Sequence, residues 1–147
     1  MTRVLWLSVL LALGVAFAHA DLTSSEPAAN AVLAEAPAAV LLEFTEPVET
    51  MFSVFKVYRL EADVDLSADN AQQRLAGLAG ALVNEVLDLR EDDAARVDTE
   101  VLPAGGTARE LSLTLAADLP AGHYVVMWRV LSVDTHVTEG FFAFSVE

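Results

Sequence analysis

The sequence contains no cysteine. This absence excludes disulfide bonds, thiolate metal ligands and a cysteine nucleophile. Basic residues are also few, since 8 Lys and Arg stand against 22 Asp and Glu and the formal net charge is −14. That charge argues against nucleic acid and against anionic membrane surfaces as partners. It is compatible with cations, with a cationic partner, or with a role in solubility alone.

No apolar run has the length of a membrane-spanning helix. The longest one, residues 4–15, follows a short start that contains Arg3 and precedes the small-x-small sequence Ala-Phe-Ala at 16–18. This arrangement predicts a secretory signal peptide over residues 1–18, with an uncleaved anchor as the alternative. The mature chain, 19–147, is then expected to be exported, to have no membrane insertion, and to form one domain.

Alternating apolar and polar residues predict several short β-strands. Clusters of Pro, Gly and Asp separate them, at 103–106 and 118–122, and Pro47 is expected to end the first strand because it cannot donate to a sheet ladder. This pattern favours an antiparallel sandwich or a Greek-key barrel. The strands are expected at residues 40–45, 52–60, 110–115, 123–130 and 141–146.

Residues 67–90 break the β pattern and predict a helical insertion. Ser67 is placed to cap the helix, and the apolar stripe is expected to pack on a sheet. The acidic residues 91–93 and Asp98 are then expected in a solvated loop, with a low-affinity cation site as the alternative. Apolar residues recur at spacings of three and four, at Leu75, Leu78, Leu82, Val86 and Leu89.

Asp134 and His136 lie two residues apart, just after a predicted strand. In an extended backbone such side chains point to the same face, so a carboxylate and an imidazole would converge on one point. This pair is either part of a metal site or a hydrogen-bonded structural pair. His123 starts a predicted strand and is interpreted as structural or exposed.

His19 becomes the first residue if the chain is cleaved after Ala18. Its free α-amine, with a pKa of about 8, and its imidazole Nδ1 can then close a chelate ring on a metal. With a third nitrogen from another His, the donor set suits tetragonal Cu(II) better than tetrahedral Zn. The alternative is that His19 is an arbitrary residue left by the peptidase.

Further motifs occur at both ends of the mature chain, though not in its middle. They are Ser-Glu-Pro-Ala at 25–28, Leu-Glu-Phe-Thr-Glu-Pro-Val-Glu at 42–49, Leu-Pro-Ala-Gly-His-Tyr-Val-Val-Met-Trp-Arg-Val at 119–130, Ser-Val-Asp-Thr-His at 132–136 and Gly-Phe-Phe-Ala-Phe at 140–144. Together with His19-Ala20 after the cleavage pattern, they resemble the CopC family of periplasmic copper-binding proteins.

The resemblance implies a mainly β, cupredoxin-like Greek-key fold that binds one Cu(II) per chain in the periplasm. By motif position the metal ligands would be His19, Asp134 and His136, with Glu46 as an extra oxygen ligand or, alternatively, a solvated carboxylate. The implied function is copper homeostasis, resistance or delivery, without catalytic residues. The expected partners are the copper ion and a membrane copper transporter or another copper protein.

Three departures from the family pattern qualify this interpretation. Thr135 replaces the usual Gly, which restricts the loop at positive φ, and the helical insertion is longer than usual. The Met-rich segment of some members is absent, and Met51 and Met127 alone remain in the mature chain, so we expect a Cu(II)-only site. Two other functions stay open, a copper-dependent monooxygenase and a metal-free interaction module.

Overall fold

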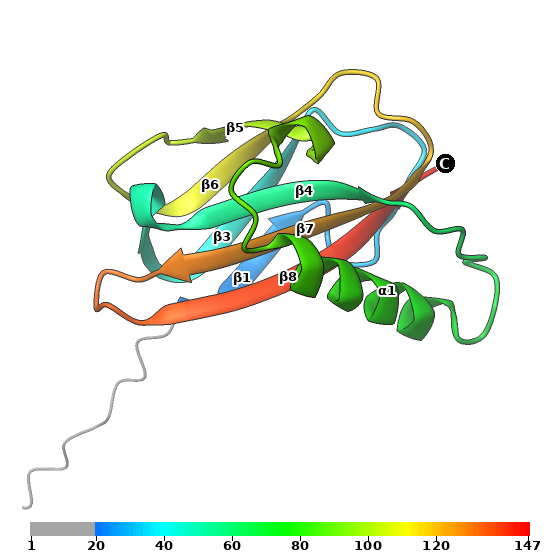
Figure 1. Cartoon of the computed structure of the whole chain (residues 1–147), viewed down its shortest axis with the longest axis horizontal. Helices are drawn as coiled ribbons and strands as arrows, with labels where there is room; N and C mark the ends of the chain where they lie inside the picture. The colour runs from blue at the N-terminus through cyan, green and yellow to red at the C-terminus, as the bar shows by residue number, and fades with distance from the viewer. Residues whose placement is uncertain (1–19) are drawn as a thin grey trace, which may run out of the picture.

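The computed structural model describes residues 20–147. The predicted signal peptide and His19 therefore lie outside the described residues. Within that part, two β-sheets pack face to face and one helix lies against the second sheet (Figure 1). The elements are β1 (Leu22–Glu26), β2 (Val32–Leu33), β3 (Ala39–Glu49), the 3-10 helix η1 (Thr50–Phe52), β4 (Val54–Leu60), α1 (Ala71–Val86), the 3-10 helix η2 (Asp93–Ala95), β5 (Asp98–Leu102), β6 (Thr107–Leu115), β7 (Gly122–Leu131) and β8 (Val137–Val146).

The strand order is β1-β3-β6-β5 in the first sheet and β2-β8-β7-β4 in the second. All neighbouring strands are antiparallel except β2 and β8. The order requires the chain to cross repeatedly between the two sheets. The prediction of a mainly β, cupredoxin-like Greek-key sandwich with a helical insertion is confirmed.

The main core lies between the sheets and is built by the alternation that the sequence shows. Val40, Leu42 and Phe44 of β3 are buried opposite Trp128 of β7, whose ring meets Phe44 edge-on with centroids 6.0 Å apart. Gly140 of β8 pairs with Trp128, and a Cβ there would clash with the indole ring. Burial of apolar area in this core is the main source of stability.

A second core lies between α1 and the outer face of the second sheet, where the helix covers Tyr58, Val125, Met127 and Ala143. The predicted apolar stripe is only partly right, because Leu78 is 37% and Leu89 is 50% exposed. Alanines in the contact face let the helix approach the sheet more closely than a row of leucines would. The helix residues that are buried are Ala71, Leu75, Ala79, Val83 and Val86.

The predicted N-cap of this helix is wrong. The helix begins after Asn70, which makes no side-chain cap hydrogen bond. The Ser67 hydroxyl instead donates to Asp65, at 2.6 Å, in the loop ahead of the helix. Such local bonding of a hydroxyl to a nearby acceptor competes with capping.

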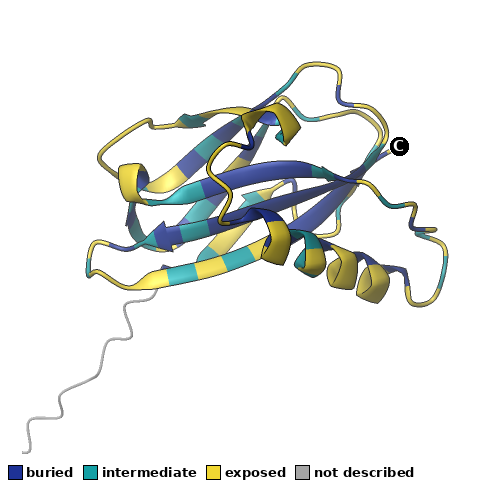
Figure 2. Ribbon diagram, in the orientation of Figure 1, coloured by how far each residue is buried: buried dark blue, intermediate teal, exposed yellow. Residues whose placement is uncertain are grey.

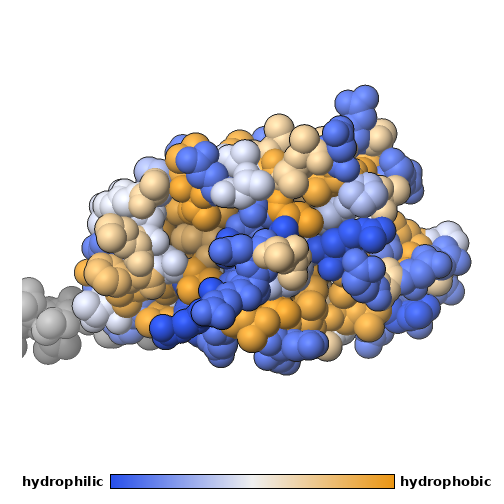
Figure 3. Space-filling model, turned by 45° about the horizontal axis from the view of Figure 1, so that its top comes forward, coloured by the Kyte–Doolittle hydropathy of each residue, from blue (hydrophilic) through white to orange (hydrophobic). Residues whose placement is uncertain are grey.

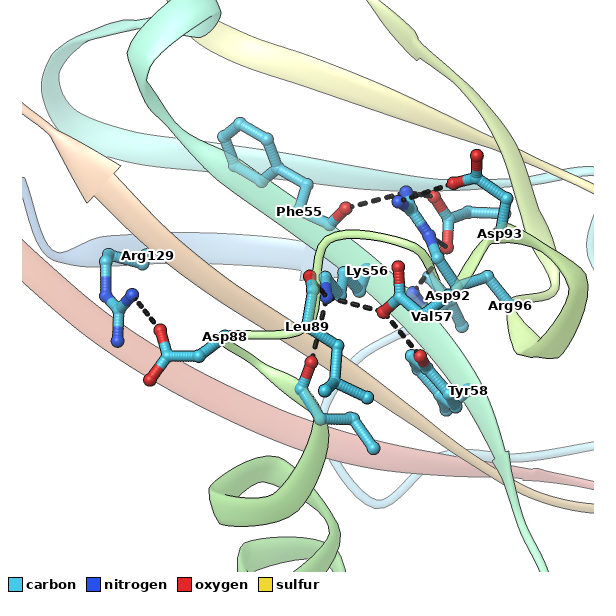
Figure 4. A network of polar contacts seen from close by, with 12 residues as sticks. Phe55, Lys56, Val57, Tyr58, Asp88, Leu89, Asp92, Asp93, Arg96 and Arg129 are labelled. Carbon is cyan, nitrogen blue, oxygen red and sulfur yellow. Dashed lines mark hydrogen bonds and ion pairs between the residues drawn. The ribbon is translucent and has the colours of Figure 1, made fainter.

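Asp92 was expected in a solvated loop, and that expectation is wrong. Its side chain is 5% exposed and accepts hydrogen bonds from Lys56 Nζ and from the Tyr58 hydroxyl, both at 2.5 Å (Figure 4). Lys56 Nζ also donates to the carbonyls of Val86, at 2.8 Å, and Leu89, at 2.7 Å. A buried cation thus satisfies the last carbonyl of α1, at Val86, where the helix dipole favours positive charge, and the Leu89 carbonyl just after the helix.

Asp98 is buried as well, against the same expectation. Its Oδ1 accepts hydrogen bonds from the Val57 backbone N–H, at 2.7 Å, and from Arg96 Nε, at 3.1 Å. Arg96 also donates to the Phe55 carbonyl, at 3.0 Å (Figure 4). The acidic segment is therefore bound to β4, and in this structure its two buried carboxylates are engaged by protein donors.

β3 does not end before Pro47, as the sequence had suggested, but continues to Glu49. Its pairing with β6 is interrupted between Glu43 and Val48. Pro47 lies in this interruption, where its missing N–H removes no hydrogen bond of the β3–β6 ladder. The continued strand carries Glu46 toward the loop that joins β7 and β8.

Candidate metal centre

Asp134 and His136 lie in the tight loop between β7 and β8. Its turn is closed by hydrogen bonds from Thr135 N to Ser132 O and from Ser132 N to His136 O, both at 2.9 Å. The two side chains therefore converge through a turn, and not through the extended backbone that the spacing suggested. Thr135 has a φ of +74°, a conformation that is strained for a β-branched residue and that glycine adopts freely.

The Asp134 carboxylate is held from several sides. Its Oδ1 accepts a hydrogen bond from the buried Ser132 hydroxyl and another from His136 N, at 3.3 Å. Its Oδ2 lies 2.8 Å from His136 Nδ1. These hydrogen bonds, the one from Ser132 first, place the pKa of Asp134 below its usual range. The group is a carboxylate at neutral pH.

The contact with Asp134 also orients the His136 ring. When Nδ1 carries the proton and donates it to the carboxylate, Nε2 keeps a lone pair for a metal. The His136 side chain is 58% exposed, so solvent reaches it. This carboxylate–imidazole arrangement is common at metal sites, where the carboxylate fixes the tautomer of the ligand.

The beginning of the described chain lies at the same end of the sandwich. Ala20 is fully buried, and its carbonyl accepts a hydrogen bond from the Thr138 hydroxyl, at 2.9 Å, two residues beyond His136. Asp21 N donates to Thr45 Oγ1 at 3.0 Å, which fixes the same segment to β3. The point where residue 19 joins the chain is therefore held between β3 and β8, close to the loop.

Glu46 is half-buried on β3, next to that loop. The segment after it meets the loop directly, since Val133 N donates to Pro47 O at 3.3 Å and Val48 forms a β-bridge with Ser132. Over residues 20–147, however, no three His, Asp or Glu side chains form a group that could hold a metal. The structure brings Asp134 and His136 together and does not bring Glu46 into a group with them.

His123 has a structural role, in agreement with one of the two interpretations given above. It is 8% exposed, and its Nδ1 lies 2.8 Å from Ser145 Oγ on the neighbouring strand β8. Among the described histidines this leaves His136 as the accessible one. His19 lies outside the described residues.

Exposed apolar side chains occur in the loop and in the neighbouring helix η1, a feature that sequence reasoning missed. Met51 and Phe52 of η1 are 75% and 73% exposed, and Val133 is 49% exposed. The Ser53 hydroxyl accepts a hydrogen bond from Leu131 N, at 3.0 Å, which fixes η1 beside the loop. Hydrophobic side chains lie at the left end of the molecule in Figure 3. Apolar residues beside a strand end are usually buried, so the sequence held no signal of this exposure.

Comparison with known proteins gives consistent results. Residues 22–147 match the sequence model of the CopC domain. The chain is 34% identical to Protein YobA of Escherichia coli K12 over 131 residues, which cover 89% of this chain and 81% of that protein. It is 30% identical to copper resistance protein C of Escherichia coli over 140 residues, or 93% of this chain and 90% of that protein.

Among solved structures, the methionine-rich copper resistance protein PcoC of Escherichia coli superposes with a TM-score of 0.58 at 27% identity. The match covers 88% of this chain and all (100%) of that chain. In residues 20–147 of the present protein, no helix is both long enough and apolar enough to cross a membrane.

Proposed function

Because the chain belongs to the CopC family of copper-resistance proteins, we propose that it is an exported protein that binds one Cu(II) for copper homeostasis or delivery. In this proposal residues 1–18 are a signal peptide and His19 is the first residue in the periplasm. The observation that carries the proposal is the Asp134–His136 pair beside the anchored residue Ala20.

The proposed ligands are nitrogen atoms from both ends of the chain. His19 supplies its α-amine and Nδ1, and His136 supplies Nε2, a set of three nitrogens that suits tetragonal Cu(II). The 2.8 Å contact between Asp134 Oδ2 and His136 Nδ1 supports a role of Asp134 in orienting the ring. The role as an oxygen ligand, which the family motif implies, would require Asp134 to leave Nδ1. Glu46, next to the loop, is kept as an additional oxygen ligand.

A partner that delivers or removes copper is part of this proposal. The exposed side chains of Met51, Phe52 and Val133 give the copper-binding end an apolar rim, which suits contact with a membrane copper transporter or another copper protein. A catalytic role is not proposed, because the chain matches the CopC domain and copper resistance proteins. Peroxide-dependent oxidation by the copper-loaded protein would contradict that part of the proposal.

The test compares Cu(II) affinity at neutral pH between a chain that starts at His19 and one with a Gly-Ser extension ahead of it. The extension keeps the imidazole and removes the free amine. We expect a large loss of affinity in the extended chain, and a large loss for His136→Ala in the chain that starts at His19. Asp134→Asn should reduce affinity by about 10- to 100-fold, as is common when the partner of a ligating His is changed.

Two outcomes would contradict the proposal. Equal affinity of the two chains would show that the amine of His19 does not bind copper. Weak binding that His136→Ala leaves unchanged would favour a metal-free interaction module. Circular dichroism of each variant serves as the control, because the loop substitutions leave the core between the sheets intact.

A further inference from the structure

The outer face of the first sheet carries a groove of about 750 Å³ over β1, β3 and β6. The buried residues Leu42 and Leu111 point into the core from β3 and β6, so their neighbours along each strand point outward into the groove. Pro103, at the end of β5, lines its far side. A volume of this size is typical of ligand-binding clefts.

The strand register arranges the groove residues in two adjacent rows. In one row, Glu43 of β3 lies between Ser24 of β1 and Glu110 of β6. In the other row, Glu26 of β1, Leu41 of β3, Ser112 of β6 and Leu102 of β5 lie side by side across all four strands. Leu41 is 48% and Leu102 is 42% exposed. The groove therefore has an acidic row beside a row that is partly apolar.

Glu43 and Glu110 are directly opposite each other, an arrangement of like charges that destabilises a sheet. The Ser24 hydroxyl donates to Glu43 Oε2 at 2.8 Å and orients this carboxylate. In the part of the chain that the structure describes, no ion pair includes Glu26, Glu43 or Glu110. The fold thus accepts a local repulsion that a bound positive group would relieve.

The chemistry of the groove discriminates between possible occupants. A small metal ion is disfavoured, because no three acidic or imidazole side chains of residues 20–147 converge closely enough to hold one. A second copy of this chain is disfavoured as well, because the net charge of −14 and the acidic row would oppose self-association. A cationic group on a larger, partly apolar partner satisfies both rows at once.

We propose that this groove binds an extended segment of a partner protein in which Arg or Lys and apolar side chains take turns on the one face that meets the groove, so that a cationic residue and an apolar residue stand two positions apart. The cationic side chains would meet Glu43, Glu110 and Glu26, and the apolar ones would pack over Leu41 and Leu102. Residues two apart on an extended segment point to the same face, and the two rows are likewise two residues apart along β3, at Leu41 and Glu43. This interaction goes beyond copper binding and does not depend on His19 or His136.

The test uses the 15N-labelled chain that starts at His19, without copper, and a blocked peptide acetyl-Arg-Ser-Leu-Ser-Arg-Ser-Leu-Ser-amide, in which Arg and Leu share one face. A peptide with Gln in place of each Arg is the matched probe. We expect chemical-shift changes confined to β1, β3, β5 and β6, weaker binding in higher salt, and little binding of the Gln peptide. The double variant Glu43→Gln, Glu110→Gln should bind about three- to tenfold more weakly, since exposed ion pairs are individually modest.

The control is the double variant Glu85→Gln, Glu91→Gln, which removes the same charge from exposed positions elsewhere and should leave binding unchanged. Equal loss in both double variants would show unspecific attraction to an acidic protein and overturn the proposal. So would shift changes on α1, absence of binding, or concentration-dependent dimers in sedimentation that involve the groove residues. Cu(II) affinity measured on the same variants should not change, so this proposal and the copper proposal fail separately.

Discussion

The two outer faces of the sandwich differ, although both belong to four-stranded sheets of the same domain. α1 covers the second sheet, so β4 is buried on both sides over most of its length, whereas β3 in the first sheet alternates between buried and exposed residues. Figure 2 shows β4 as dark blue over most of its length, and α1, which covers this sheet, as yellow on its solvent side. A strand that is covered on both faces loses the alternation by which a half-buried strand is recognised.

The two faces also differ in whether their charged side chains have partners of opposite charge. On the covered face Lys56 is buried, and its ammonium group has an acidic partner and two helix carbonyls as acceptors. On the open face Glu43 and Glu110 lie opposite each other without a cationic partner in the described chain. Water can solvate an exposed carboxylate but not a buried ammonium, so only the covered face requires a partner within the fold.

The largest effect is expected for Asp92→Ala on the covered face. This change leaves Lys56 Nζ buried without its carboxylate and deprives the Tyr58 hydroxyl of its acceptor. Breaking a buried pair in this way costs about 3–5 kcal/mol of unfolding free energy. Urea denaturation followed by tryptophan fluorescence measures it. Asp93→Ala is the matched control, because the Asp93 side chain is 92% exposed, and it should change stability by less than about 0.5 kcal/mol.

The pH dependence of stability gives a second check on Asp92. Burial opposes ionisation of this carboxyl, but hydrogen bonds from Lys56 and Tyr58 outweigh it and hold the pKa below its usual range. The carboxylate therefore stabilises the fold above the unfolded pKa of about 3.9, and this stabilisation is lost as the pH falls through the lower folded pKa. In Asp92→Ala, the unfolding free energy should therefore fall less steeply as the pH is lowered. An unchanged dependence on pH in the acid range would show that other carboxylates cause the loss of stability.

A pair of leucine substitutions compares the two faces directly. Leu75 of α1 is 2% exposed, whereas Leu41 of β3 is 48% exposed. Leu75→Ala should cost about 2–5 kcal/mol because it leaves a cavity under the helix. Leu41→Ala should cost less than about 1 kcal/mol, since little apolar area returns to water. Similar losses in thermal unfolding would mean that the groove is less open than the structure shows.

The contrast between the faces also explains what the sequence could predict. The inward-facing residues Val40, Leu42 and Phe44 recur at every second position, and this period predicted β3 and the sandwich. The short edge strands β1, β2 and β5 were not predicted, since they have few inward apolar residues and their pairing depends on distant segments. Asp92 and Asp98 were expected to be solvated because the groups that bury them, Lys56 Nζ and the Val57 N–H of β4, are distant in the sequence.

At the candidate metal centre, sequence reasoning brought Asp134 and His136 together but assigned the wrong backbone to them. The family motif predicted that Asp134 and His136 belong to one site. The turn around Thr135, with its positive φ, depends instead on the tertiary pairing of β7 and β8. The role of His19 stays a prediction, because it lies outside the described residues. Nothing in the local sequence indicated that Met51 and Phe52 would be exposed beside the loop.

The two glycines of α1 test how closely the helix approaches its sheet. A Cβ on Gly77 would meet no atom within 4 Å, whereas one on Gly80 would lie 3.4 Å from the Phe141 ring. Gly77→Ala should therefore raise the unfolding free energy by about 0.5–1 kcal/mol, the usual gain in helix propensity. Gly80→Ala should gain less, because the new methyl group presses on Phe141. A larger gain at Gly80 than at Gly77 in thermal unfolding would contradict this close packing.

The smallest effect is expected on the open face, at the opposed carboxylates. Glu110→Gln removes one of two like charges that face each other across β3 and β6, and it should raise the unfolding free energy by about 0.2–1 kcal/mol at low salt. A double-mutant cycle with Glu43→Gln isolates the repulsion, since the second substitution should add little once the first is made. Added salt should reduce the coupling, because both groups are reached by solvent. Zero coupling at low salt would mean that the side chains turn away from each other, and the groove would then lack the uncompensated charge that a cationic partner requires.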